Sequence, residues 1–374
     1  ELMKRAGIDM LQPAEAAPLV RRELLYAPSG GGEVVIAGSL GLLENSRTPN
    51  CGLDVQLANQ ALQASGSVHT LLSEITGVDD DQMVLFETVL NPEEQPFLHD
   101  HALNNIPLLP GVMGIEGFSA AARQVVSVLA SQGAEFRVAG ISDIQFHIPL
   151  KFYRNESRRI TWKARVLQEG DHLAAYVRLE STLQLRTGEA RQLLHFSGKV
   201  SLQTPHQPLK EKKVHPPALN GNYAIGSDHI YQIYFHGPAF RVLDSVQRSK
   251  EGLVGRLRQD QPAILSKPHP LLTPPVLVEL CLQTAGVWEA GITGVLGLPQ
   301  SIGELELYHN DPNGSTVYSI VQPRRMEDGS LAFDARVVDE NGRLYLEMRD
   351  YRTSPMPYGV EKNLLDPIKP LTNS

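Results

Sequence analysis

The sequence predicts an α+β protein built from two copies of one unit, each a long helix beside a mostly antiparallel sheet. Two segments, at residues 112–130 and 275–291, have the length and apolar content of buried helices. Each is followed by stretches rich in β-branched and aromatic residues, which predict strands. When the chain is compared with itself at a shift of 163 residues, one helix falls on the other.

The repeat is clearest at the start of these two helices. Setting PLLPGVMGIEGFSAAA, from Pro107, over PLLTPPVLVELCLQTA, from Pro270, gives five identities in sixteen positions without a gap. One identity places Glu116 on Glu279. A charged residue at the same point of two apolar helices is harder to attribute to chance than matched leucines. We therefore interpret the chain as a duplicated unit.

The first copy is expected to span residues 68–204 and the second residues 222–358. The helix of the first copy has apolar side chains at the spacing of one buried face: Val112, Ile115, Phe118, Ala122, Val125 and Leu129. Its strands are predicted around residues 136–149, 159–167, 172–182 and 193–202. Those of the second copy are predicted at residues 301–309, 315–323, 331–340 and 343–353.

The flanking segments have a different character. Residues 10–24 predict a short helix, and GGGEVVIAG after them predicts a glycine-rich turn and a strand. Residues 45–67 are polar, and residues 205–221 are rich in Pro and Lys, so both are expected to be linkers. Residues 359–374 are expected to be a tail.

Composition excludes several classes of protein. The formal net charge of -8 argues against a broad nucleic-acid-binding surface. No stretch approaches the roughly 18 consecutive apolar residues of a membrane span. Cys51 and Cys281 are the only cysteines and fit neither a metal knuckle nor a disulfide framework, so a reducing cytoplasm is the expected location. The first residues, ELMKRAGIDM, include no signal peptide or initiator Met, and we expect a part of a longer protein.

The two copies differ where chemistry is expected. His101 precedes the first helix, whereas the shifted position in the second copy is Ile264. Gln283 follows Glu279 by four residues on the same helical face, whereas the first copy has Ala120 there. Such complementary loss is expected when a symmetric dimer with two sites fuses and keeps one. It indicates a site that combines His101 with Glu279 and Gln283.

At these residues the sequence resembles the dehydratase domains of type I polyketide synthases and related multifunctional polyunsaturated-fatty-acid synthases. The first family motif is His, three residues, Gly, four residues, Pro; His101 and Pro110 keep the spacing, and Asn105 replaces the glycine. The second motif is an acid followed four residues later by Gln or His, matched by Glu279 and Gln283. Most polyketide dehydratases have Asp there, whereas single-hotdog dehydratases often have Glu.

A third family segment, usually Tyr-Gly-Pro-x-Phe, corresponds to HGPAF, with His236 in place of the tyrosine. The resemblance covers about residues 68–358 and implies a double hotdog fold. It also implies a β-hydroxyacyl substrate carried on the phosphopantetheine arm of an acyl carrier protein, with no metal or nucleotide cofactor. The parent synthases usually dimerise, so a homodimer is expected.

Residues 1–44 resemble the C-terminal end of a ketoreductase domain. They contain no glycine-rich dinucleotide fingerprint, so no NADPH site is expected in them. A ketoreductase upstream would make the β-hydroxyacyl group that a dehydratase consumes.

The residues fit this chemistry. A neutral imidazole at His101 would take the Cα proton, and Glu279, with a pKa expected to be raised by its apolar surroundings, would protonate the leaving hydroxyl. Gln283 would orient the carboxyl. Free N–H groups at the helix start after Pro110 and Gly111 would hold the thioester oxygen. Tyr234 and His236 are expected to line the pocket.

Alternative interpretations remain open from the sequence. His99 and His101 also fit a metal pair, although no third ligand stands out at a usual spacing. Glu116 competes with Glu279 as the acid but lacks a neighbouring Gln, which favours a structural role. An inactive double-hotdog scaffold, or a hotdog thioesterase or cyclase, would share the fold.

Overall fold

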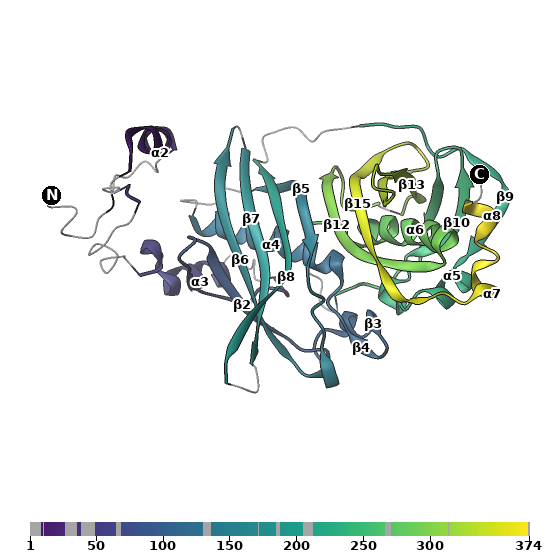
Figure 1. The fold of residues 1–374 in the computed structure, drawn as a ribbon, viewed down its shortest axis with the longest axis horizontal. Coiled ribbons are helices and arrows are strands. Elements are labelled where there is room, and N and C mark those ends of the chain that lie inside the picture. Colours follow the sequence, from purple (N-terminus) through teal and green to yellow (C-terminus); the bar gives the residue numbers. More distant parts are fainter. Residues whose placement is uncertain are drawn as a thin grey trace.

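Two units of the same design share one sheet in this structure, a computed structural model that describes residues 9, 11–26, 36–38, 49–64, 69–129, 136–170, 172–184, 188–204, 212–265, 271–312 and 314–372. Within these residues the large sheet has 13 antiparallel strands in the order β1-β2-β6-β7-β8-β5-β12-β15-β14-β13-β11-β10-β9. The sheet curves around two long helices, α4 and α6 (Figure 1).

The spatial order of the strands confirms the predicted repeat and the double hotdog fold. The first unit consists of β1 (Glu74–Val78), β2 (Val84–Leu90), α4 (Gly111–Leu129), β5 (Arg137–Phe146), β6 (Arg158–Glu169), β7 (His172–Gln184) and β8 (Ala190–Gln203). The second consists of β9 (Leu219–Gly226), α5 (Ser227–Ile233), β10 (Leu243–Ser249), β11 (Leu253–Leu257), α6 (Pro275–Thr293), β12 (Val295–Leu307), β13 (Val317–Arg325), β14 (Leu331–Asp339) and β15 (Leu344–Gly359). Apart from β9, the strand order of one unit mirrors that of the other.

The two units meet where β5 pairs with β12, so that the sheet continues from one unit into the other. The pairing runs from Gln145 opposite Ser301 to Gly140 opposite Glu306. A side chain at Gly140 would place its Cβ 2.8 Å from the carbonyl oxygen of Leu305, so glycine allows the two strands to approach. We call this β5–β12 pairing the seam.

The helices form the centre of the core. The predicted face of α4 is buried from Val112 to Val125, and Phe118 meets the ring of Trp162 edge to face with centroids 5.9 Å apart. Helix α6 is buried on most sides because β10 to β14 wrap around it, which explains why its apolar residues follow no single stripe.

The segments expected to be linkers and tail contain more structure than predicted. Residues 45–67 include α3 (Val55–Ala64), which buries Ala58 and Leu62 against the first unit. Within residues 205–221, β9 begins at Leu219. Residues 359–374 form α7 (Lys362–Leu365) and α8 (Lys369–Thr372), and α8 packs on α6 with Leu371 buried.

The helix predicted at residues 10–24 is α2 (Pro13–Tyr26), which stands apart from both units (Figure 1). The strand predicted in GGGEVVIAG falls mostly outside the described residues. No helix in the described ranges is both long and apolar enough to cross a membrane.

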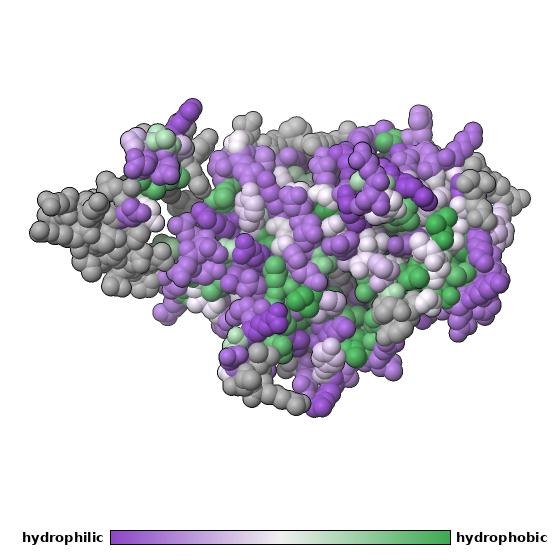
Figure 2. Space-filling model, in the orientation of Figure 1, coloured by the Kyte–Doolittle hydropathy of each residue, from purple (hydrophilic) through white to green (hydrophobic). Residues whose placement is uncertain are grey.

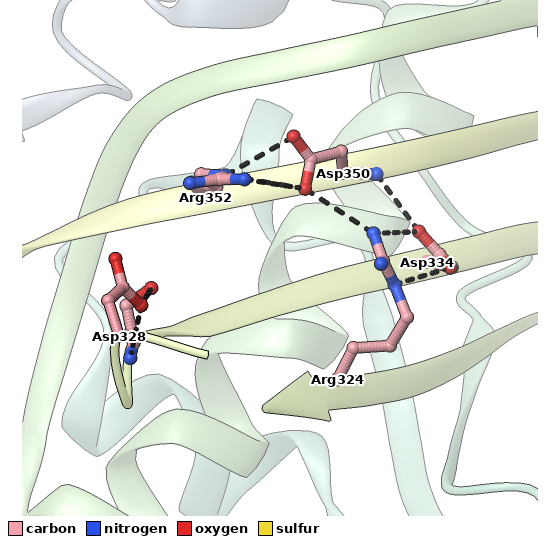
Figure 3. Close-up of polar contacts among 6 residues, drawn as sticks. Arg324, Asp328, Asp334, Asp350 and Arg352 are labelled. Carbon is pink, nitrogen blue, oxygen red and sulfur yellow. Dashed lines mark hydrogen bonds and ion pairs between the residues drawn. The ribbon is translucent and has the colours of Figure 1, made fainter. Parts of the chain in front are cut away.

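The outer face of the second unit carries a network of charged side chains. Arg324 on β13 pairs with Asp334 on β14 at 2.7 Å and with Asp350 on β15 at 3.3 Å, and Arg352 pairs with Asp350 (Figure 3). Each of these half-exposed pairs contributes about 0–1 kcal/mol to stability. We assign the pairs of Arg324 to holding β13 beside β14 and β15. Hydrophilic residues cover most of the face in Figure 2, with hydrophobic patches near its middle and over the second unit.

Candidate active site

A cavity of about 400 Å³ lies between the units and draws residues from both. The first unit contributes His101 and Gly111; the second contributes Tyr234, His236, Glu279 and Gln283. The structure therefore brings six of the seven predicted site residues into one cavity. The seventh, Pro110, is buried beside it: its carbonyl accepts hydrogen bonds from Met113 and Gly114 in the first turn of α4, so it starts the helix and does not line the cavity.

A tight hairpin positions His101. It links β3 (Ala102–Leu103) to β4 (Ile106–Pro107), and both turn residues, Asn104 and Asn105, have positive φ, 51° and 62°. Asparagine tolerates this left-handed conformation better than most residues, which explains how Asn105 replaces the glycine of the family motif. His101 Nδ1 lies 3.2 Å from the carbonyl oxygen of Leu108 and donates to it, which leaves Nε2 as the basic nitrogen.

The HGPAF segment is fastened directly to the residues around His101. His236 and His101 form a β-bridge, and Gly237 N donates to the carbonyl oxygen of Asp100 at 2.7 Å. The carboxylate of Asp100 also accepts from Ala239 N at 3.0 Å. A Cβ on Gly237 would lie 2.3 Å from Asp100 Oδ1, so only glycine fits. We call Asp100, Gly237 and Ala239 the Asp100 clamp, since they hold the two histidines together.

Glu279 and Gln283 lie one turn apart on α6 and touch. Gln283 Nε2 donates to Glu279 Oε1 at 2.7 Å and to the carbonyl oxygen of Phe240 at 2.7 Å. The amide oxygen of Gln283 accepts from the hydroxyl of Tyr231 at 2.8 Å, which fixes the orientation of the amide. Tyr234 donates to the carbonyl oxygen of Gln283 at 2.6 Å.

His236 lies beside the same carboxylate. Its Nε2 is 3.3 Å from Glu279 Oε1, its ring stacks on Phe235 at 4.5 Å, and its ring centroid is 5.3 Å from that of His101. An imidazole from the first unit and a carboxyl from the second therefore face one cavity, with a second imidazole between them.

Family models match both units. A model described as polyketide synthase dehydratase domain matches residues 69–204, and one described as polyketide synthase dehydratase N-terminal domain matches residues 224–363. The chain belongs to the polyketide synthase dehydratase family. Its function is accordingly dehydration in a polyketide assembly line, and these comparisons give no support to the inactive-scaffold interpretation.

Solved dehydratase structures have the same fold. The dehydratase domain of the CurF module of curacin polyketide synthase is 18% identical, with a TM-score of 0.59 over 77% of this chain and 100% of that one. The domain of the CurJ module is also 18% identical, with a TM-score of 0.58 over 78% of this chain and 97% of that one. A trans-AT dehydratase domain from Brevibacillus brevis is 16% identical, with a TM-score of 0.54 over 76% and 98%.

The surroundings of the two dehydratase side chains set their protonation. Burial and the nearby charge of His236 lower the pKa of His101 to about 4, so the imidazole is neutral over the physiological range. Burial raises the pKa of Glu279, but the hydrogen bond and the charge of His236, with the hydrogen bond from Gln283, outweigh it, and the net pKa is lowered. The raised pKa expected for Glu279 was therefore wrong, because hydrogen bonds to the charged form win over desolvation.

Glu116, the competing acid, is buried away from the cavity and fully engaged. It faces His69 Nε2 at 3.1 Å and accepts hydrogen bonds from Leu272 N, Thr273 N and the Thr273 hydroxyl. The carboxylate thus joins α4 to the loop ahead of α6. Its contacts correspond to the structural role that the sequence favoured.

Several residues in and around the dehydratase cavity were not predicted. Tyr231 donates to Gln283, Asp100 accepts from the backbone of Gly237 and Ala239 next to His236, and Lys151 lines the cavity with a cationic side chain. The apolar part of the wall consists of Phe146, Phe196, Leu282, Leu296, Leu298 and Met356. Glycine is needed at position 111 because a Cβ there would lie 2.8 Å from the ring of Phe146. The sequence contains both halves of the clamp, at residues 99–101 and in HGPAF, but nothing in it shows that the two segments pair. The clamp could therefore not be predicted.

Proposed function

We propose that this domain removes water from a β-hydroxyacyl thioester carried by an acyl carrier protein, with His101 as the base and Glu279 as the acid. The observation that supports this proposal most directly is that an imidazole of the first unit and a carboxyl of the second line the same cavity. In the step, His101 Nε2 takes the Cα proton, the Cα–Cβ double bond forms, and the β-hydroxyl leaves with a proton from Glu279 as water.

The cavity supports a thioester on a long arm. Its apolar wall suits an acyl chain, and half-exposed Lys151 offers a cation for the phosphate of a phosphopantetheine arm. Gly111 exposes the start of α4, whose N–H groups suit a thioester oxygen that gains charge. Proton transfer alone accomplishes this reaction, so the proposal needs no metal or nucleotide cofactor.

Relatives supply further support for the acid–base pair. Solved structures of the CurK dehydratase, 18% identical to this chain, include an inactive His-to-Phe variant and an inactive Asp-to-Asn variant. By analogy we place His101 and Glu279 in the two roles. We further propose an upstream ketoreductase and a homodimeric synthase, which the sequence resemblance implies, and a cytoplasmic location, which the two cysteines suggest.

Mass spectrometry of a β-hydroxyacyl carrier protein tests the proposal. Wild type is expected to remove one water from the acyl group, and His101→Ala and Glu279→Gln are each expected to lower the rate by roughly 10²–10⁴-fold. His99→Ala is the matched control, because His99 is exposed and does not line the cavity. Thioester hydrolysis in place of water loss would favour a thioesterase, and full activity of His101→Ala would reject the assigned base.

A further inference from the structure

The site holds one histidine more than the acid–base pair requires. In the proposed function, Glu279 must hand a proton to the leaving hydroxyl. Yet the carboxylate receives hydrogen bonds from Gln283 and His236, and their combined effect keeps its pKa below the ordinary value. At neutral pH a carboxylate so placed has given up its proton. The proton for the hydroxyl must come from a neighbour.

His236 is the neighbour that can hold it. Its Nε2 faces Glu279 Oε1 at 3.3 Å, and both side chains are buried, with 6% and 7% of their surface exposed. Gln283 Nε2, the other group that donates to this oxygen, cannot release a proton. Tyr234 and Tyr351 lie nearby, but burial raises the pKa of each hydroxyl well above its ordinary value, so both stay neutral.

Among the described residues around His236, Glu279 is the one whose charged group faces a nitrogen of its ring. Arg241 Nε donates to the backbone oxygen of His236 and not to its ring. His101 Nδ1 is committed to Leu108. His236 Nδ1 is buried and has no hydrogen-bond partner in the described part of the chain. A protonated ring would thus be stabilised only by the contact of Nε2 with Glu279. The proton on Nε2 is therefore the one that can pass to the carboxylate.

We propose that His236 and Glu279 share the catalytic proton, so that the acid of this dehydratase is an imidazolium–carboxylate pair. The inference rests on the proposed function. When the Cβ–O bond breaks, the Glu279 carboxylate takes the Nε2 proton of His236 and passes it to the departing oxygen. The products are water and the enoyl thioester; His101 has gained the Cα proton and His236 has lost one.

The arrangement also closes the proton cycle. His101 and His236 are β-bridge partners with ring centroids 5.3 Å apart. Passing the Cα proton from His101 back to His236, directly or through the released water, restores both side chains. The net reaction then consumes no proton from the solvent.

His236→Gln tests the relay, because glutamine retains an N–H donor for Glu279 but carries no exchangeable proton. At pH 7 its kcat is expected to fall by roughly 10²-fold with little change in KM. The loss should shrink as the pH is lowered, because without the charge of His236 burial raises the pKa of Glu279, which then binds its own proton while His101 is still neutral. His99→Gln, at an exposed position, is the control. An equal loss at every pH would show that His236 only supports the fold, and would overturn the inference.

A second measurement does not depend on activity. In protein with ¹⁵N-labelled histidine, NMR at pH 7 should show His236 doubly protonated in wild type and neutral in Glu279→Gln, which lacks the carboxylate. A neutral His236 in wild type would reject the shared proton. If wild type removes no water, the proposed function fails, and the NMR result still decides whether the pair holds a proton.

Discussion

Individual protons decide what this site can do. His101, the proposed base, is neutral because burial and the charge of His236 lower its pKa to about 4, whereas Glu279 stays ionised because its hydrogen bonds outweigh its burial. The two groups are therefore shifted in the same direction. A free histidine would be half protonated near pH ~6.5 and would lose its basic form in mild acid.

The lowered pKa of His101 predicts an unusually acid-tolerant rate. The acid limb of kcat/KM is expected to have its midpoint nearer pH 4 than pH 6.5, because the basic imidazole persists until its pKa of about 4 is reached. A pH–rate profile with circular dichroism at each pH checks this. A limb centred near pH ~6.5 in a folded protein would contradict it.

The same shift affects stability with a definite sign. The pKa of His101 in the folded chain lies below its unfolded value. Between these two values the unfolded chain binds a proton that the folded chain does not. The free energy of unfolding therefore falls as the pH falls from about 6.5 to about 4. This contribution is absent above the upper value.

Sequence could predict that His101, Glu279 and Gln283 share one cavity, but not their protonation. Their identities follow from complementary loss between two aligned copies, which needs no coordinates. The pKa of Glu279 depends on its 3.3 Å contact with His236, a residue 43 positions earlier, and no spacing rule relates the two. The chemistry of the acid is thus a property of the folded chain.

At the scale of elements, the Asp100 clamp sets the distance between the histidines. It ties η5 (Pro238–Phe240) to the residues after η3 (Pro96–Leu98) through backbone hydrogen bonds and one carboxylate. These are irregular segments without a sheet to align them. Their relative position therefore depends on close contact at Gly237.

Gly237→Ala is expected to loosen the site. Because the new Cβ would lie 2.3 Å from Asp100 Oδ1, the two segments must separate, with a cost of about 1–3 kcal/mol in stability. Displacing the histidines should lower kcat by roughly 10–10²-fold. Thermal unfolding and the water-loss assay measure both effects.

Gly226→Ala is the matched control for this substitution. A Cβ on Gly226 meets no atom within 4 Å and the residue has an ordinary φ of -84°. Equal behaviour of the two variants would refute the role of the clamp.

Helices and strands could be predicted where the apolar pattern extended over many residues. The helices α4 and α6 and the strands β5 to β8 and β12 to β15 lie where apolar periodicity placed them, within a few residues except that β12 starts, and β15 ends, six residues beyond the predicted bounds. The helices α7 and α8 have four residues each, too few to show a period. Helix α3 does have an apolar face, which buries Ala58 and Leu62, but the polar composition of residues 45–67 as a whole suggested a linker.

At the scale of the molecule, the seam and the buried Glu116 network join the units, in addition to the Asp100 clamp. The seam continues β5 into β12, and the Glu116 network lies between α4 and the loop ahead of α6. The network satisfies a fully buried carboxylate with charge-assisted hydrogen bonds. Because the network joins the two units, we expect removal of the Glu116 charge to lower the stability of both.

Glu116→Gln is expected to destabilise the whole domain by about 2–4 kcal/mol, because the amide group would face backbone N–H donors in place of a carboxylate. Chemical denaturation should show one cooperative transition shifted to lower denaturant. Glu93→Gln, at an exposed position, is the control and should unfold like wild type. A stability equal to wild type for Glu116→Gln would contradict a structural role.

The two matched glutamates have consequences for the ancestry of the chain. Glu116 now receives the Thr273 loop, while Glu279 lies beside His236. Two copies of the second unit would have Ile264 where an imidazole is needed, and two copies of the first would have Ala120 in place of Gln283. Neither unit alone therefore carries all three side chains that the shared cavity combines.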